Sequence, residues 1–394
     1  MLAFLKTEYC LLLLAVISGI FLLGGIYMIR KERILLLAEE LRKRDIDALY
    51  IGPSADLEYI GEFSSLPDER MRGLMVAKDG SCFALTPLLY REEMMDAFGD
   101  VPFYSQWDDH EGFAAAFRRG CEKLGIAGGK IAFNDGVRAV DMLAVADAAG
   151  IRPVSGQDML AGMRSRKDDE ELFNLRRASE IIDAVIERLY SFIRPGMKER
   201  EVIRAVPEFI EELGGEGESF SPIVASGPNA SMPHYCGGDR VIREHEPVIV
   251  DIGCRYRSYC SDTTRTFFVG EPMAEMRDIY EIVRSAQAAG EAAVLPGATG
   301  EDVDRAARKV ISDSGFGKYF FNRVGHGVGV AVHESPYIIE GNKAVLEPGN
   351  VFSIEPGIYI AGRFGIRIEN LVAVKPDGTA ETLNHTITGI RIIN

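Results

Sequence analysis

Hydrophobic and polar positions change their period along the chain, and these changes predict its elements. Over residues 30–50 the apolar residues first recur at helical spacing and then run together, which predicts an amphipathic helix leading into a strand. The same alternation continues with strands expected at 71–80, 81–86 and 130–134 and helices at 111–125 and 139–150. Strands that alternate with helices are typical of an α/β domain, which we assign to residues 30–165.

A charged stretch over residues 165–171 begins the second part of the chain. It predicts a long helix that ends near Phe192, with Asp168 as its N-cap. Further along, the segments that begin at Pro195 and Pro296 repeat each other at an offset of 101 residues. Two similar halves predict a pseudo-symmetric α+β domain over residues 166–394, with a site between its halves.

The amino-terminal segment has a different pattern from the rest. Residues 9–29 contain no charged side chain, and about 20 apolar residues are enough to cross a bilayer. Because basic residues cluster after this run, the sequence predicts one transmembrane helix that anchors a cytoplasmic catalytic domain to the membrane. The alternative is a mis-assigned start: translation from Met28 would give a chain without this segment.

The composition of the chain argues against some classes of function. The chain of 394 residues has 44 Lys and Arg against 59 Asp and Glu, a formal net charge of −15. A surface this acidic argues against a nucleic-acid partner, because phosphate binding needs a basic surface. Six scattered cysteines, without zinc-type spacing, argue against a disulfide framework.

Four carboxylates and one histidine stand in unusual places. Asp251 ends an apolar strand-like run, and Asp262 follows eleven residues later, so that a hairpin would bring them together. Glu355 and Glu369 each lie beside apolar strand patterns, and His326 lies in a glycine-rich run. A carboxylate inside a core is costly unless it is paired, protonated or bound to metal. Taken singly, each could be an ordinary charge at a strand end.

Taken together, the five residues predict a two-metal site. Four carboxylates carry a charge of −4, which two divalent cations would neutralise. Oxygen donors with a single imidazole suit Mn²⁺ or Co²⁺ best, and Fe²⁺ or Zn²⁺ also fits this donor set.

The order Asp–Asp–His–Glu–Glu, carried by DIG, SDTTRTF, GHGVG, EPGIY and RIEN, resembles the pita-bread metallopeptidases. The resemblance covers residues 168–394 and is strongest to the Xaa-Pro peptidase branch, which includes prolidase and Xaa-Pro aminopeptidase. An α/β domain of this size before the catalytic domain is typical of that branch and of creatinase. The implied fold is a creatinase/prolidase-like α/β domain followed by an α+β pita-bread catalytic domain, after the apolar amino-terminal helix, and the implied assembly is a homodimer.

The resemblance also implies roles for four further residues. His234 and His333 match histidines that contact the substrate carbonyl and the tetrahedral intermediate. Tyr359 and Arg367 match residues that orient a metal-binding aspartate. From the sequence alone these side chains also fit other places: a strand end for His333, the core for Tyr359 and the surface for Arg367.

The expected activity is hydrolysis of an Xaa-Pro peptide bond in a small peptide, by a dipeptidase or an aminopeptidase. In this hypothesis a hydroxide that bridges two metal ions attacks the carbonyl. Glu355 would transfer the proton to the leaving nitrogen, while His234 and His333 stabilise the oxyanion.

Two other functions remain open at the level of sequence. One is metal-dependent hydrolysis of a non-peptide amide, as in ectoine-derivative or creatinase-like hydrolases on the same fold. The other is a non-enzymatic binding protein, although such relatives have lost metal ligands that are all present here.

Overall fold

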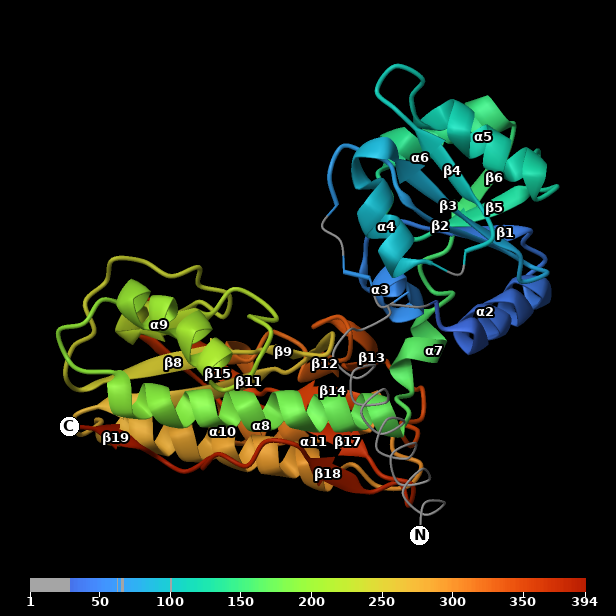
Figure 1. Cartoon of the computed structure of the whole chain (residues 1–394). Helices are drawn as coiled ribbons and strands as arrows, with labels where there is room; N and C mark the ends of the chain where they lie inside the picture. Colours follow the sequence, from blue (N-terminus) through green and yellow to red (C-terminus); the bar gives the residue numbers. More distant parts are fainter. Residues whose placement is uncertain (1–28, 62, 65–66, 100) are drawn as a thin grey trace, which may run out of the picture. The chain divides into compact units, whose positions relative to one another are not determined.

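The computed structural model describes residues 29–394, except for residues 62, 65, 66 and 100 (Figure 1). The chain forms two compact units that divide between Leu160 and Ala161. Each unit has its own sheets and its own hydrophobic core.

The first unit is built on one mixed sheet of six strands in the order β4-β3-β2-β1-β5-β6. Strand β1 pairs antiparallel with β2 and parallel with β5, so the sheet changes direction at its centre. The strands are β1 (Ala48–Ile51), β2 (Gly73–Ala77), β3 (Cys82–Pro87), β4 (Tyr104–Trp107), β5 (Lys130–Phe133) and β6 (Arg152–Ser155). The α-helices of this unit within the described residues are α2 (Lys31–Lys43), α3 (Ala55–Gly61), α4 (Arg91–Ala97), α5 (Phe113–Lys123) and α6 (Ala139–Ala149).

The second unit carries the longer helices. They are α7 (Ala161–Ser165), α8 (Asp169–Phe192), α9 (Glu199–Glu212), α10 (Ala274–Ala292) and α11 (Gly300–Asp313). One sheet has the order β19-β11-β8-β7, from β7 (Ile223–Ser226), β8 (Glu246–Ile252), β11 (Thr263–Val269) and β19 (Ile392–Ile393). Another has the order β13-β12-β14-β17-β18, from β12 (Gly325–Gly327), β13 (Glu334–Ile338), β14 (Val351–Ile354), β17 (Asn370–Val374) and β18 (Ala380–Thr382). Two short pairs join β9 (Arg255–Tyr256) to β10 (Tyr259–Cys260) and β15 (Gly357–Ile360) to β16 (Phe364–Arg367).

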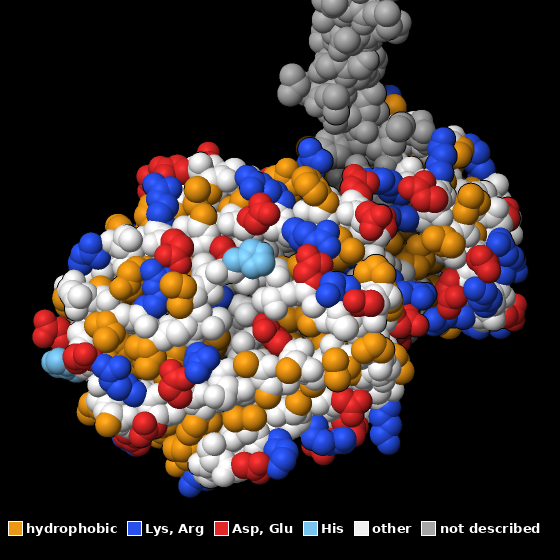
Figure 2. Space-filling view, turned by 90° about the horizontal axis from the view of Figure 1, so that it is seen from below, with side chains coloured by type: hydrophobic (Ala, Val, Ile, Leu, Met, Phe, Trp, Pro, Cys, Tyr) orange, Lys and Arg blue, Asp and Glu red, His pale blue; other side chains and the backbone are white. Residues whose placement is uncertain are grey.

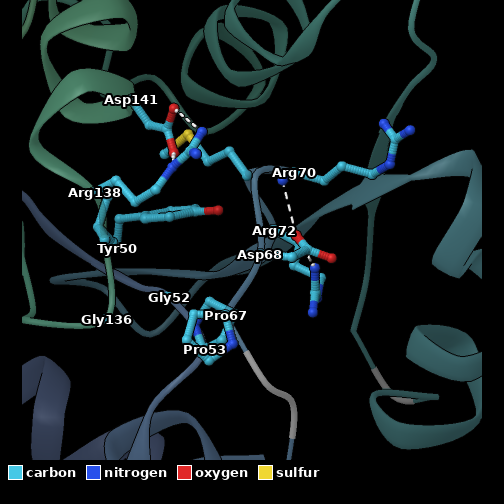
Figure 3. A pocket seen from close by; sticks show the side chains of 12 residues that line it. Tyr50, Gly52, Pro53, Pro67, Asp68, Arg70, Arg72, Gly136, Arg138 and Asp141 are labelled. Carbon is cyan, nitrogen blue, oxygen red and sulfur yellow. Dashed lines mark hydrogen bonds and ion pairs between the residues drawn. The ribbon is translucent and has the colours of Figure 1, made fainter.

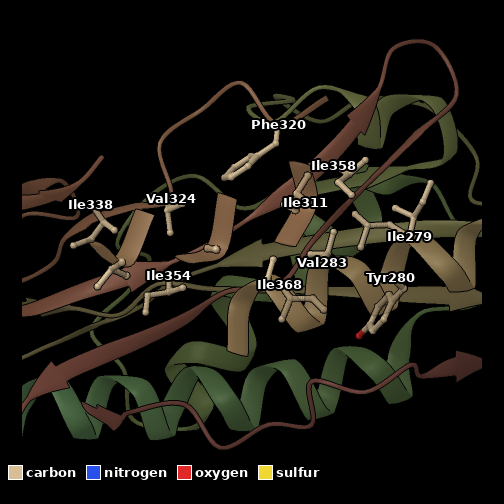
Figure 4. Packing of buried hydrophobic residues seen from close by; sticks show 14 of the residues in the cluster. Ile279, Tyr280, Val283, Ile311, Phe320, Val324, Ile338, Ile354, Ile358 and Ile368 are labelled. Atoms are coloured by element: carbon tan, nitrogen blue, oxygen red, sulfur yellow. The ribbon is translucent and has the colours of Figure 1, made fainter. Parts of the chain in front are cut away.

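The internal repeat corresponds to two half-structures in this unit. Helices α9 and α11 start and end 101 residues apart, the offset seen in the sequence. Side chains of α8 and α9 pack on the β7–β8–β11 sheet to form one core cluster. Side chains of α10 and α11 pack on strands of the other half, where Val283, Ile311 and Ile354 belong to the same cluster (Figure 4). The candidate ligands come from strands of both halves.

Several predicted elements are present with small shifts in their ends. The helix expected after residue 168 is α8, and Asp168 caps it in a capping box with Glu171, as its sequence indicated. The helices expected at 111–125 and 139–150 are α5 and α6. Strands β4 and β6 were not predicted, since each has only four residues and neither is fully buried.

The prediction of a transmembrane helix is not met by any helix that the structure describes. Within the described residues, no helix is long and apolar enough to cross a membrane. The two longest, α8 and α10, carry charged side chains along their length and bury only one face. Residues 1–28, on which the prediction rested, lie outside the described part of the chain.

The first unit contains a small cavity of about 20 Å³ beside Tyr50 (Figure 3). Its charged neighbours are paired: Arg138 with Asp141, and Arg72 with Asp68. A cavity of this volume holds about one water molecule. It is therefore too small to be the site of a peptide hydrolase.

Candidate metal and active site

Strand pairing brings the two aspartates of the hairpin together. Strands β8 and β11 are antiparallel, and Asp251 lies opposite Thr264. Asp262 directly precedes β11, and both aspartates are buried. A two-residue spacing places Asp262 and Thr264 on the same side of the extended chain, so the carboxylates and the Thr264 hydroxyl occupy one region.

His326 and Glu355 come from the other half. His326 lies in β12, where its Nδ1 donates to the carbonyl of Gly327 at 3.2 Å. This bond orients the ring so that Nε2 would be the ligand atom for a metal ion. His326 Nε2 lies 3.2 Å from Glu355 Oε1 and 3.6 Å from Asp262 Oδ2. The imidazole thus turns its Nε2 atom toward two carboxylates.

Glu369, which directly precedes β17, completes the group. Ligand atoms of Asp262, His326 and Glu369 all lie within 4.8 Å of one another. Asp251 Oδ1 and Glu369 Oε1 are buried without a hydrogen-bond partner among the described residues. Unpaired buried carboxylate oxygens are costly, and a cation removes that cost. The donor set therefore fits divalent metal ions.

The pKa values of these carboxyls reflect their crowding. Burial raises the pKa of Asp262 well above its usual range, and the charges of Glu369 and Asp251 raise it further. Burial likewise raises the pKa of Glu369, with Glu355 and Asp251 adding to the effect. Like charges this close cannot all ionise unless positive charge lies among them.

Glu355 differs from its neighbours. Burial acts to raise its pKa, but the hydrogen bond and charge of His326, together with the charges of Arg367 and Arg323, outweigh burial, and the pKa of Glu355 is lowered. The carboxylate also accepts a bond of 3.3 Å from the Ser353 hydroxyl. In the metal-free fold Glu355 therefore ionises more readily than Asp262 and Glu369.

Arg367 organises one side of the site. Its guanidinium donates from Nη2 to Asp251 Oδ2 at 2.6 Å and from Nη1 to the Tyr359 hydroxyl at 2.9 Å. Its Nε donates to Thr264 Oγ1 at 3.0 Å, and that hydroxyl donates to Glu369 Oε2 at 2.6 Å. A continuous chain of bonds thus runs from Asp251 through Arg367 and Thr264 to Glu369. Charge-assisted bonds of this kind fix the orientation of carboxylates.

The two further histidines lie at the exposed side of the group. The His333 ring lies edge-on to the His326 ring, with 4.2 Å between their centroids. Burial, together with the charges of His326 and Arg323, lowers the pKa of His333 to about 4. His234 is exposed, and the residue before it accepts a bond from Arg367 through its carbonyl. At neutral pH His333 is therefore an uncharged donor at the edge of the site.

Two residues that the sequence reasoning missed take part in this arrangement. Thr264 was overlooked because threonine is an ordinary strand residue, although its alternation with Asp262 was visible. Arg323 lies close enough to influence the pKa of His333 and Glu355. Its position three residues before His326 was the only sequence signal.

The face of the molecule drawn in Figure 2 carries side chains of both charges among its described residues. Acidic and basic side chains are interspersed over the face in Figure 2.

Comparison with known proteins identifies the family. The model of metallopeptidase family M24 matches residues 174–376, and that of the creatinase/prolidase N-terminal domain matches residues 33–166. The chain belongs to metallopeptidase family M24. It is a metallopeptidase, and membership of this family implies divalent metal ions at the site.

The relatives share nearly the whole length of the chain. A protein named probable dipeptidase PepE from Mycobacterium tuberculosis is 38% identical over 359 residues, 90% of this chain and 94% of the relative. A protein named Xaa-Pro dipeptidase from Lactobacillus delbrueckii subsp. lactis is 34% identical over 365 residues, 90% of this chain and 96% of the relative. The predicted membership of the Xaa-Pro branch of this family is confirmed.

Solved structures agree. A prolidase from Thermococcus sibiricus superimposes with a TM-score of 0.87 at 35% identity, covering 92% of this chain and 98% of the other. A dipeptidase from Pyrococcus horikoshii gives a TM-score of 0.86 at 36% identity, covering 91% and 99%. The predicted fold of a creatinase-like domain followed by a pita-bread catalytic domain is therefore confirmed.

Proposed function

We propose that this chain is an Xaa-Pro dipeptidase that binds two divalent metal ions through Asp251, Asp262, His326, Glu355 and Glu369. The observation that carries the proposal is the group of four carboxylates and one imidazole, all buried except the partly buried Glu355. Two of the carboxylate oxygen atoms have no hydrogen-bond partner among the described residues. The relatives named dipeptidase and Xaa-Pro dipeptidase support the substrate class.

The side chains take separate roles in this reaction. Glu355, whose pKa is lowered, accepts a proton from the attacking water and delivers it to the proline nitrogen as that nitrogen leaves. His234 and His333 donate hydrogen bonds to the oxygen on which negative charge develops. The free amino group of the substrate carries a positive charge that suits the acidic group.

Metal ions at this site would act as Lewis acids, polarising the scissile carbonyl and making water acidic enough to lose a proton near neutral pH. Mn²⁺ and Co²⁺ fit the oxygen-rich donor set best. Arg367 and Tyr359 hold Asp251 in orientation through their bonds of 2.6 Å and 2.9 Å.

The decisive experiment compares Xaa-Pro dipeptides with Xaa-Pro-Xaa tripeptides in the presence of added Mn²⁺ or Co²⁺. Turnover of dipeptides with little turnover of tripeptides supports the proposal, and preference for tripeptides makes the chain an aminopeptidase instead. Asp262→Ala and Glu369→Ala should each lose bound metal and activity together. A variant with full turnover would contradict the ligand assignment. Homodimer formation stays a prediction, which light scattering would test.

A further inference from the structure

Glu334, the residue after His333, has its carboxylate buried between two cations. Arg164 Nη2 lies 2.6 Å from Oε2, and Lys167 Nζ lies 2.7 Å from Oε1. The side chains of Glu334 and Lys167 are 6% and 1% exposed. Burying three charges is expensive, and apolar residues of similar volume often stabilise a protein as well or better. A role in stability alone therefore explains this cluster poorly.

The segment that carries Arg164 and Lys167 is held in place by hydrogen bonds within the second unit. Arg164 lies in α7, and Lys167 immediately precedes the N-cap of α8. The backbone N–H of Lys167 donates to the carbonyl of Gly349 at 2.9 Å. Asn350 Nδ2 donates to the carbonyl of Ser165 at 2.8 Å. The segment that carries both cations is therefore held independently of Glu334.

The loop before His333 folds closely around the Glu334 carboxylate. A Cβ atom on Gly329 would lie 2.4 Å from Glu334 Oε1, so a larger residue there would push against the carboxylate. The N–H of Ala331 points to Oε2 at 3.5 Å, and the N–H of Gly329 donates to the carbonyl of Ala331. The carboxylate thus fixes the path of residues 329–331.

Glu334 also fixes the strands that carry both histidines. It pairs across the β12–β13 ladder with Gly327, the residue after His326. His333 precedes it directly, and the two imidazoles are 4.2 Å apart at their centroids. Movement of Glu334 would therefore change the position of His333 relative to His326.

We propose that Arg164, Lys167 and Glu334 form a positioning cluster that holds the loop of residues 327–333 and sets the place of the His333 imidazole beside His326. Glu334 acts through His333 and touches no reacting atom. The kinetic part of this inference rests on the proposed function, in which His333 donates to the oxyanion.

The first test observes the imidazole directly. Glu334→Gln keeps the shape of the side chain and removes its charge. We compare the histidine ring NMR signals of the full-length Zn²⁺-loaded wild type and variant, with the His333 signal assigned by its loss in His333→Ala. The matched control is Glu381→Gln, which breaks the pair of Glu381 with Arg176 on α8. The His333 signal should shift or broaden in Glu334→Gln and stay in place in Glu381→Gln. An unmoved signal in Glu334→Gln would overturn the proposal.

The second test is a double-mutant cycle in an Xaa-Pro assay. Glu334→Gln should lower kcat by about 10- to 100-fold, because small displacements of a catalytic group cost this much. The change in KM should be small. In a His333→Ala background, Glu334→Gln should lower kcat less than about twofold, because the imidazole through which Glu334 acts has already been removed. An equal loss in both backgrounds would show that the cluster does not act through His333.

A second variant tests the same role in case Glu334→Gln does not fold. Gly329→Ala keeps all three charges and pushes on the carboxylate, so it should move the same His333 signal. A signal that stays in place would contradict the proposal. Absence of Xaa-Pro turnover in the wild type would refute the proposed function, while the NMR comparison would still decide the positioning role.

Discussion

Arg367 and Asp251 are joined by a hydrogen bond of 2.6 Å, although 116 positions separate them in the chain. Asp251 belongs to the first half of the catalytic unit and Arg367 to the second. Their bond therefore ties the halves together at the candidate metal site. The fixed fork of an arginine can hold Asp251, Tyr359 and Thr264 at once, which a lysine cannot.

Arg367→Lys should therefore weaken metal binding although the positive charge is kept. Loss of a partner that orients a ligand typically costs about 10- to 100-fold in metal affinity. Calorimetric titration with Mn²⁺ measures this. The control is Arg363→Lys, which alters an exposed pair with Glu275. Equal affinity in Arg367→Lys and the wild type would contradict the role given to the guanidinium.

We expect Thr264 to contribute to activity only through its hydroxyl. It donates to Glu369 and accepts from Arg367, so Thr264→Val removes a link between them while it keeps the shape. We expect kcat/KM to fall about tenfold or more, because a buried charged group then loses a bond worth about 1.5–3 kcal/mol. Thr264→Ser keeps the hydroxyl and should restore most of the activity. Failure of Ser to rescue would point to packing of the methyl group instead.

The sequence revealed those residues that break an expected pattern. Asp251, Asp262 and Glu369 stood out because a carboxylate in an apolar run needs compensation. Thr264 did not, because a threonine in a strand needs none. His326 lies in β12 and Glu355 directly follows β14, and only the fold shows that Nε2 of His326 lies 3.2 Å from Oε1 of Glu355.

Contacts between segments far apart in the chain could not be predicted from the sequence pattern. Lys167 and Glu334 are 167 positions apart, and each is an ordinary charge in its own segment. The prediction of a membrane span rested on the length and hydropathy of the apolar run at residues 9–29. Residues 1–28 lie outside the described part of the chain, and no described helix is long and apolar enough to cross a membrane.

Metal binding should release protons and strengthen as the pH rises. The pKa values of Asp262 and Glu369 are raised in the metal-free fold, so both carboxyls keep their protons to a higher pH than in the unfolded chain. The metal-free fold therefore loses stability as the pH rises through the raised values, and a cation that displaces those protons restores it. Calorimetry in two buffers with different ionisation enthalpies counts the protons. The Glu369→Gln variant should release fewer protons on metal binding than the wild type. An equal number of protons would contradict the assignment of Glu369 as a ligand that loses its proton.

The cap of α8 should contribute to stability. Asp168 accepts a bond from the N–H of Glu171, whose side chain returns a bond to the Asp168 N–H. Asp168→Ala should lower the free energy of unfolding by about 1 kcal/mol. Urea denaturation followed by circular dichroism measures the loss. Asp169→Ala, one residue on and exposed, should cost less than half as much, and equal losses would argue against the cap.

Glu355→Gln separates proton transfer from ligand binding at one position. The amide keeps one oxygen that can face a cation, but it cannot accept a proton from water. In the metal-free fold the pKa of Glu355 is lowered while those of Asp262 and Glu369 are raised, so Glu355 ionises most readily of the three. We expect kcat to fall by about 100- to 10000-fold, the usual contribution of general acid–base catalysis. KM should change little, and metal content by mass spectrometry should stay well above that of Glu369→Ala. If turnover survives in Glu355→Gln, another group must carry the proton, and His333, neutral at pH 7, would be the next to test.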